Sequence, residues 1–160
     1  MQFLTFQPKD YSLLIDWIDS AECNLLWGGP KYQYPLTLEQ ISSFLSNDDV
    51  RPMVLTRDDT MVGYIELFRV SDDEYRLCRV LVVDKNSRGK GYGKQLVQRS
   101  VDYIREHFAA KSVSLAVFEH NQSAVGCYQS LGFISEKTEQ YQPEFMDKPW
   151  PLLHMRLSLS

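Results

Sequence analysis

A glycine-rich turn between an apolar strand and a helix constrains this chain more than any other stretch. The turn reads Arg88-Gly89-Lys90-Gly91-Tyr92-Gly93, after the apolar run Val80-Leu81-Val82-Val83 and before a helical pattern that starts near Lys94. Glycines at alternate positions let the backbone turn with its N–H groups pointing inward. A helix start adds unpaired N–H groups and the positive end of the helix dipole. Together they predict a site for a phosphate or pyrophosphate.

The hydrophobic pattern predicts one α/β domain over residues 1–160, because no linker, repeat or low-complexity tract interrupts it. Strand patterns cover residues 2–6, 52–57, 61–70, 75–83, 113–118, 133–141 and 152–159. Helical patterns cover residues 11–18, 38–45, 94–108 and 121–131, and residues 27–35 are expected to form a structured loop. Strands and helices that alternate in this way predict a mixed sheet flanked by helices.

Composition excludes several classes of protein. The net charge of −4 argues against a general nucleic-acid binder, and no apolar run approaches the ~20 residues of a membrane span. The N-terminus lacks the pattern of a signal peptide. Cys23, Cys78 and Cys127 are scattered, with no CxxC pair and no histidine at zinc-ligand spacing. We therefore expect a cytoplasmic protein with no metal, no disulfide framework and no membrane partner.

The charges are unevenly distributed along the chain. Residues 1–75 carry 5 basic and 13 acidic side chains, whereas residues 76–160 carry 12 and 8. An acidic first half and a basic glycine turn suggest an anionic cofactor and a cationic substrate.

Two common phosphate motifs do not fit the glycine turn. A Walker A loop needs Ser or Thr after Gly93-Lys94, where this chain has Gln95, and a glycine where Arg88 stands. A Rossmann fingerprint needs a third glycine where Lys94 or Leu96 lies. Both nucleotide motifs are therefore disfavoured.

The turn does match the pattern R/Q-x-x-G-x-G/A, which resembles the GNAT superfamily of acyl-CoA-dependent N-acyltransferases. A second stretch, Asn121-x-x-Ala124-x-x-x-Tyr128-x-x-x-Gly132-Phe133, is similar to a downstream helix of that superfamily. The order of the elements extends the likeness to nearly the whole chain. The resemblance implies a GNAT-like fold with a mixed, mostly antiparallel sheet of six to seven strands and about four helices.

The resemblance also implies how acetyl-CoA would bind as co-substrate. Leu81, Val82 and Val83 would pair with the pantetheine arm, and a strand N–H near Val82 or Val83 would polarise the thioester carbonyl. Asn121 would contact the cofactor arm, although it is also a good helix cap. The pyrophosphate would be cradled by Arg88, Gly89, Lys90, Gly91, Tyr92, Gly93 and Lys94. Lys90 is equally well read as an exposed loop lysine.

Two residues are predicted to move protons. The resemblance implies that Tyr128 lies near the thioester sulfur, where its phenol could protonate the departing thiolate, although Tyr128 also suits a core aromatic position. Some family members carry a glutamate on the strand before the turn, near the position of Leu77, but that strand has no carboxylate here. Glu66, on the preceding strand, is the candidate general base. A half-exposed glutamate without a catalytic role, or a water chain for the proton, are the alternatives.

The acceptor is predicted only as a class. The acidic, aromatic first half is expected to form a pocket for a cationic amine, from Asp16, Trp17, Asp19, Glu22, Trp27, Tyr32 and Tyr34. Resemblance to subgroups implies a protein N-terminus or an aminoglycoside as acceptor, and a polyamine or an amino acid is a second hypothesis within the same chemistry. A non-catalytic acyl-CoA-binding regulatory module is the alternative to an enzyme. The closing strands suggest a homodimer.

Overall fold

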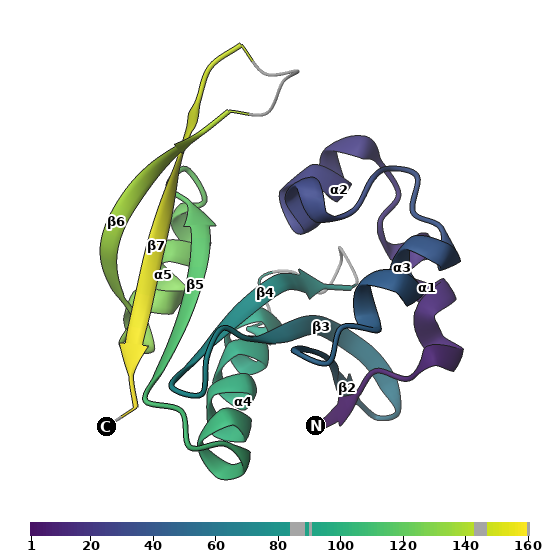
Figure 1. The fold of residues 1–160 in the computed structure, drawn as a ribbon, viewed down its shortest axis with the longest axis horizontal. Coiled ribbons are helices and arrows are strands. Elements are labelled where there is room, and N and C mark those ends of the chain that lie inside the picture. Colours follow the sequence, from purple (N-terminus) through teal and green to yellow (C-terminus); the bar gives the residue numbers. More distant parts are fainter. Residues whose placement is uncertain (84–88, 90, 143–146, 160) are drawn as a thin grey trace. The chain divides into compact units, whose positions relative to one another are not determined.

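The computed structural model describes residues 1–83, 89, 91–142 and 147–159 of the chain. Arg88 and Lys90, which we predict in the phosphate site, lie outside these residues. The strands are β1 (Gln2–Thr5), β2 (Val50–Arg57), β3 (Thr60–Arg69), β4 (Glu74–Val82), β5 (Ser112–Phe118), β6 (Ile134–Tyr141) and β7 (Trp150–Ser158). The helices are α1 (Tyr11–Trp17), α2 (Ala21–Gly28), α3 (Leu38–Leu45), α4 (Tyr92–His107) and α5 (Gln122–Ser130), with short 3₁₀ helices at Pro8–Asp10 and Gly29–Lys31 (Figure 1).

The strands form one seven-stranded sheet in the order β1-β2-β3-β4-β5-β7-β6. The pairs β1–β2, β2–β3, β5–β7 and β6–β7 are antiparallel. Strands β4 and β5 run parallel, from Glu74 opposite Ser112 to Leu77 opposite Leu115. The predicted α/β class with a mixed, mostly antiparallel sheet is therefore confirmed.

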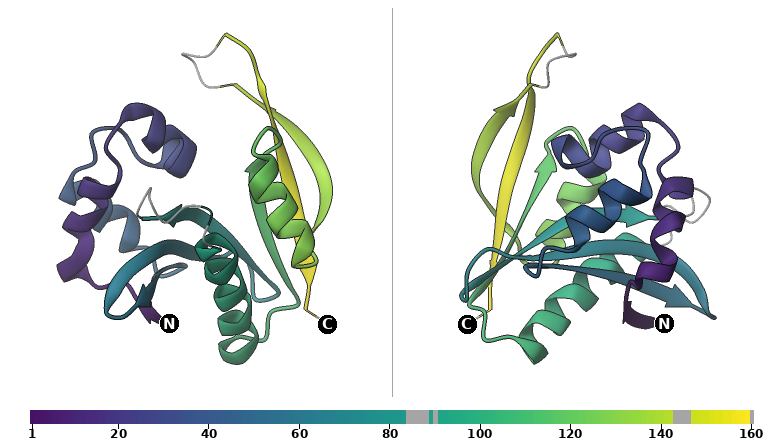
Figure 2. Two further views of the ribbon diagram at one scale, coloured as in Figure 1. Left: turned by 180° about the vertical axis from the view of Figure 1, so that it is seen from behind. Right: turned by 45° about the vertical axis from the view of Figure 1, so that its right-hand side comes forward.

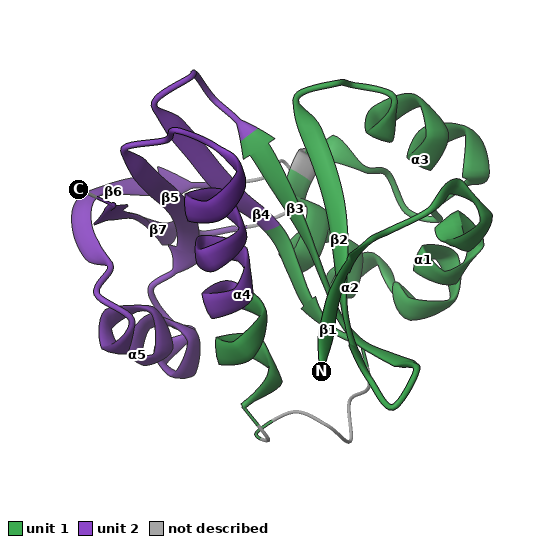
Figure 3. Cartoon of the chain, turned by 90° about the horizontal axis from the view of Figure 1, so that it is seen from below, with its two compact units in different colours: residues 1–68, 79–96 green, residues 69–78, 97–160 purple. Residues whose placement is uncertain are grey.

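The chain divides into two compact units, residues 1–68 with 79–96 and residues 69–78 with 97–160 (Figure 3). A single domain over residues 1–160 remains a prediction. No helix among the described residues is long and apolar enough to cross a membrane.

In the first unit, α1, α2 and α3 lie together on one side of β2 and β3 (Figure 2). Helix α3 begins as predicted, because the Thr37 hydroxyl accepts a hydrogen bond from the Gln40 N–H at 3.2 Å. The β2–β3 hairpin turns at Asp58 and Asp59, whose φ angles of 51° and 65° suit a tight hairpin turn. The core consists of Phe6, Leu14, Ile18, Trp27, Tyr32, Leu36, Ile41, Leu45, Val50, Val54, Tyr64 and Leu81.

In the second unit, β5 pairs with the first half of β4 and with β7, and β6 is the outermost strand. The rings of Tyr75 and Phe108 stack with their centroids 4.5 Å apart. Helix α5 ends before Gly132, as predicted, because this residue has a φ of 101° that favours glycine. The Phe133 N–H then donates to the carbonyl of Tyr128. This turn fixes where β6 begins.

Helix α2 is the element that the hydrophobic pattern does not predict. Its buried residues are Asn24, Trp27 and Gly28, which do not make an apolar stripe at helical spacing. The available signal is at its start, where Ser20 caps the helix by accepting from the Cys23 N–H at 3.0 Å. Because Asn24 and Gly28 are on the buried face, the sequence lacks the apolar periodicity that would predict this helix.

Gly63 on β3 marks a close approach between this strand and the first turn of α4. A Cβ atom there would lie 3.2 and 3.3 Å from the two Leu96 methyl groups and 3.6 Å from the Leu81 carbonyl oxygen. Leu96 is fully buried. We therefore expect Gly63→Ala to lower the free energy of unfolding by about 1 to 3 kcal/mol, measured by urea denaturation.

Gly126, in the middle of α5, provides the matched control. A Cβ there meets nothing within 4 Å. Gly126→Ala should raise the free energy of unfolding by about 0.5 to 1 kcal/mol, because alanine favours a helix interior. Equal stability of the wild type and Gly63→Ala would contradict the close packing at Gly63.

Candidate functional site

The glycine turn has the backbone geometry that its sequence predicts. Gly89 and Gly91 have φ angles of 84° and 82°, and a Cβ at either position would meet nothing within 4 Å. The glycines are therefore required by backbone conformation and not by lack of space. Helix α4 begins at Tyr92, and the Gln95 N–H donates to the Gly91 carbonyl. The N–H groups before Gln95 therefore lie in the first turn, where a helix has no partners of its own for them.

The side chains next to this turn are fixed to the same unit. The Tyr92 hydroxyl accepts a hydrogen bond from Arg57 Nη1 at 2.7 Å, and Tyr92 is buried. Gly93 lies next to the Val82 side chain, because a Cβ atom placed on Gly93 would be 3.8 Å from Val82 Cγ2. Lys94 is exposed. The first turn of α4 is thus held to β2 and β4 and offers main-chain N–H groups and one exposed cation to an anion.

The residues that the structure describes before the turn reach Val83. Leu81 is buried, and Val82 and Val83 are half-buried. The Val83 N–H donates to the Val62 carbonyl at 3.1 Å, so this donor is already paired. Because N–H groups alternate between the two edges of a strand, the Val82 N–H points away from β3. Of the two predicted donors, only the N–H of Val82 points away from β3.

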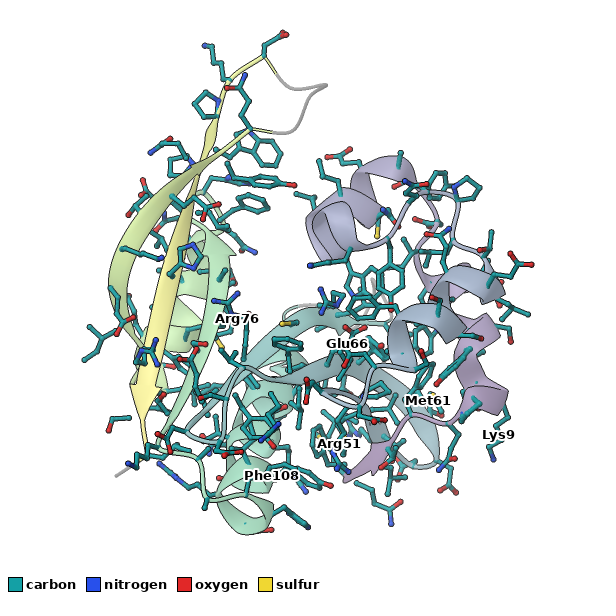
Figure 4. The ribbon with its side chains drawn as sticks, in the orientation of Figure 1. Lys9, Arg51, Met61, Glu66, Arg76 and Phe108 are labelled. Carbon is teal, nitrogen blue, oxygen red and sulfur yellow. The ribbon has the colours of Figure 1, made fainter. Side chains whose placement is uncertain are left out.

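Glu66, the predicted base, lies at the centre of a buried polar cluster on β3. Its carboxylate accepts hydrogen bonds from the Tyr64 hydroxyl at 2.6 Å, from the Tyr32 hydroxyl at 3.4 Å and from Arg79 Nε. The Glu66 side chain is fully buried and that of Arg79 is 10% exposed. Figure 4 shows Glu66 on the side of β3 on which α2 and α3 lie. The alternative of a half-exposed glutamate is therefore wrong.

Burial and hydrogen bonding act on this cluster in opposite directions. Burial raises the pKa of Glu66, while the Arg79 guanidinium and the two phenols lower it again in part. Burial, together with the nearby Glu66 charge, raises the pKa of Tyr32 and of Tyr64. Both phenols therefore stay protonated at neutral pH and can donate to the carboxylate. The sequence analysis does not identify Arg79 and Tyr64 as partners of Glu66. Tyr64 lies two residues before Glu66 on β3, a spacing that puts both side chains on one face of the strand. Arg79 lies on the neighbouring strand β4.

The second unit holds the other two predicted residues, both at α5. Asn121 Oδ1 accepts from the Ala124 N–H at 3.3 Å, so Asn121 caps the helix. Tyr128 is 9% exposed, and its ring centroid lies 6.1 Å from that of Phe133. Burial, with a smaller contribution from Cys127, raises the pKa of Tyr128 to about 12. Among the described residues, none hydrogen-bonds the Tyr128 hydroxyl.

The predicted acceptor residues separate into two groups. Trp27 and Tyr32 belong to the core of the first unit, where their rings stack with centroids 5.1 Å apart. Asp16, Asp19 and Glu22 are exposed. These three carboxylates therefore lie at the surface, whereas the rings of Trp27 and Tyr32 are packed in the core. No group of three or more histidine, cysteine, aspartate or glutamate side chains among the described residues is placed to hold a metal ion.

Residues 14–133 match the sequence model of the family described as "Acetyltransferase (GNAT) family". The chain is 30% identical over 89 residues to a probable spermine N(1)-acetyltransferase of Bacillus subtilis subsp. natto, covering 52% of this chain and 59% of that protein. It is 30% identical over 124 residues to the peptidyl-lysine N-acetyltransferase YjaB of Escherichia coli, covering 77% and 74%.

A solved structure shares the fold. The spermidine N-acetyltransferase of Vibrio cholerae, crystallised with CoA and spermine, matches with a TM-score of 0.82 at 15% identity. The match covers 98% of this chain and 94% of that one. The chain thus spans nearly all of that structure but only 59% of the spermine relative from Bacillus.

Proposed function

The chain belongs to the GNAT acetyltransferase family, and on that premise we propose that it transfers the acetyl group of acetyl-CoA to a primary amine. The observation that carries the proposal is the turn at Gly89–Gly91, whose two left-handed glycines lead into the first turn of α4. Such a turn offers several main-chain N–H groups to one anion. The pyrophosphate of acetyl-CoA is the anion that we assign to it.

The cofactor site that we propose is mostly main chain. The backbone of residues 89–94 would hold the pyrophosphate, with charge from Lys94 and from the predicted Arg88 and Lys90. Leu81, Val82 and Val83 would lie along the pantetheine arm, and Asn121 would contact that arm while it caps α5. Because the Val83 N–H is paired with Val62, we assign polarisation of the thioester carbonyl to the Val82 N–H.

The reaction that we propose is direct attack in a ternary complex. The neutral amine forms a C–N bond to the acetyl carbon, the C–S bond breaks, and the thiolate leaves. Tyr128 would donate its hydroxyl proton to that thiolate. Its raised pKa supports the proposal in one respect, since the phenol stays protonated throughout the neutral range. No covalent enzyme intermediate is needed.

Glu66 is our proposed general base for the proton that the amine loses. Burial holds its pKa above that of an ordinary glutamate, which makes the carboxylate a better proton acceptor near neutral pH. Its full burial means that the proton would arrive through a hydrogen-bonded phenol, with Tyr32 or Tyr64 as the relay. A water chain that bypasses Glu66 is the alternative.

The acceptor class rests on charge. The relatives named above act, by their names, on spermine or on peptidyl-lysine, which are both amines. The exposed carboxylates Asp16, Asp19 and Glu22 would attract such cations to the first unit. We propose a small cationic amine or a peptide amine as acceptor and a cytoplasmic location, which suits three cysteines that form no disulfide. A homodimer remains a prediction.

Binding of acetyl-CoA is the first test. Calorimetry should show binding of acetyl-CoA to the wild type and little binding of ATP or NAD. Gly91→Ala should weaken it about tenfold or more, because a left-handed alanine costs roughly 1 to 2 kcal/mol. Gly126→Ala, in open space on α5, should bind as the wild type does. Absence of acetyl-CoA binding would overturn the donor assignment.

The pH–rate profile tests the proton-transfer residues. A base must be deprotonated to act, so the rate should fall as pH drops through the raised pKa of Glu66. Glu66→Gln should remove this acid limb and lower kcat by about 10²-fold. Tyr128→Phe should lower kcat by about 10²-fold without shifting that limb. The assay measures free thiol across a panel of amines.

The exposed Glu39 on α3 provides the control, and Glu39→Gln should leave the profile unchanged. The shape of the pH–rate profile decides whether Glu66 is the base. Loss of the Arg79 ion pair alone would lower the rate equally at every pH and leave that shape unchanged. An unchanged acid limb in Glu66→Gln would rule out Glu66 as base. Binding of acetyl-CoA with no thiol release for any amine would favour the non-catalytic binding module.

A further inference from the structure

Arg79 adopts an unusual backbone conformation inside β4. Its φ angle is 51°, in the left-handed region that favours glycine, while the residues around it form a strand. An arginine there is strained and persists only when its surroundings hold it.

Arg79 is held through both its main chain and its side chain. The Arg79 carbonyl accepts a hydrogen bond from Trp27 Nε1 on α2 at 2.9 Å. The guanidinium donates to Glu66 on β3 and lies over the Phe44 ring of α3, 4.7 Å from its centroid. Three different elements of the first unit therefore converge on one residue.

The position of Arg79 gives these contacts a consequence for the cofactor site. Val80–Val83 follow directly and lead into the glycine turn. Along a strand, successive side chains point to opposite faces and successive N–H groups point to opposite edges. A residue in the left-handed conformation interrupts this alternation. The turn at Arg79 therefore sets which edge of β4 the N–H of Val82 faces.

We infer that Arg79 and Trp27 are positioning residues, which fix the Arg79 turn and thereby orient Val80–Val83 toward acetyl-CoA. The inference rests on the proposed function, in which Leu81–Val83 contact the cofactor. Neither residue touches the reacting atoms in this account. Their effect passes through the backbone of β4.

The test combines four variants with calorimetry, hydrogen exchange and steady-state kinetics. Trp27→Phe removes the N–H donor but keeps an aromatic ring on Tyr32. Arg79→Ala removes the guanidinium, and Arg79→Lys restores a cation beside Glu66. Ile41→Val loosens the same core at a fully buried residue that lies outside these contacts. Calorimetry gives the Kd of acetyl-CoA, and hydrogen exchange of the cofactor-free protein follows the amides of Val80–Val83.

Trp27→Phe and Arg79→Ala should each raise the Kd and the KM for acetyl-CoA roughly threefold to tenfold, the effect of losing one hydrogen bond. The KM for the amine should stay unchanged, and exchange at Val80–Val83 should accelerate. Arg79→Lys should recover part of the loss, and Ile41→Val should leave the Kd unchanged.

Unchanged Kd and exchange in both Trp27→Phe and Arg79→Ala would overturn the inference. An equal rise of Kd in Ile41→Val would overturn it as well, because the effect would then be general loosening of the core. If the wild type does not bind acetyl-CoA, the proposed function fails. Exchange at Val80–Val83 would still report whether Trp27 and Arg79 hold this strand.

Discussion

The buried ion pair between Glu66 and Arg79 is the interaction on which the first unit depends. A carboxylate with no exposed surface is costly to bury unless it is paired and fully hydrogen-bonded. Here Arg79, Tyr32 and Tyr64 all donate to it. Removing one partner of a buried pair typically costs about 3 to 5 kcal/mol, because the other charge is left unpaired. The pair therefore strongly constrains where β3, β4 and the Tyr32 segment lie relative to one another.

The same pair links packing to the predicted cofactor site. With Arg79 in its left-handed conformation, its guanidinium donates to Glu66 and its carbonyl accepts a hydrogen bond from Trp27 on α2. Val80–Val83 follow Arg79 in the chain, and the glycine turn comes after them in the sequence. The proposed acetyl-CoA site consists mostly of main-chain groups. The spacing of glycines in a sequence predicts the main-chain conformation that such a site needs. The acceptor depends on individual side chains, and for this reason the glycine turn specifies the donor and leaves the acceptor open.

The sequence predicts the local features well and the long-range ones poorly. The glycine turn, the Thr37 cap, the stop at Gly132 and the hairpin at residues 58–59 each follow from the conformational preference of a few adjacent residues. Helix α2 escapes prediction because Asn24 and Gly28 occupy its buried face. The burial of Glu66 could not be read from β3 alone, because its partner Arg79 lies on another strand. Trp27 and Tyr32 look like pocket aromatics in the sequence, but tertiary packing places both in the core.

A crystal structure of the protein with acetyl-CoA tests the central claim most directly. We expect the pyrophosphate to lie against the main-chain N–H groups of residues 89–94, with Arg79 in its left-handed conformation. The pantetheine arm should follow Leu81–Val83, and the thioester oxygen should lie within hydrogen-bond distance of the Val82 N–H. A pyrophosphate bound elsewhere, or a pantetheine arm that avoids Val82, would contradict the account.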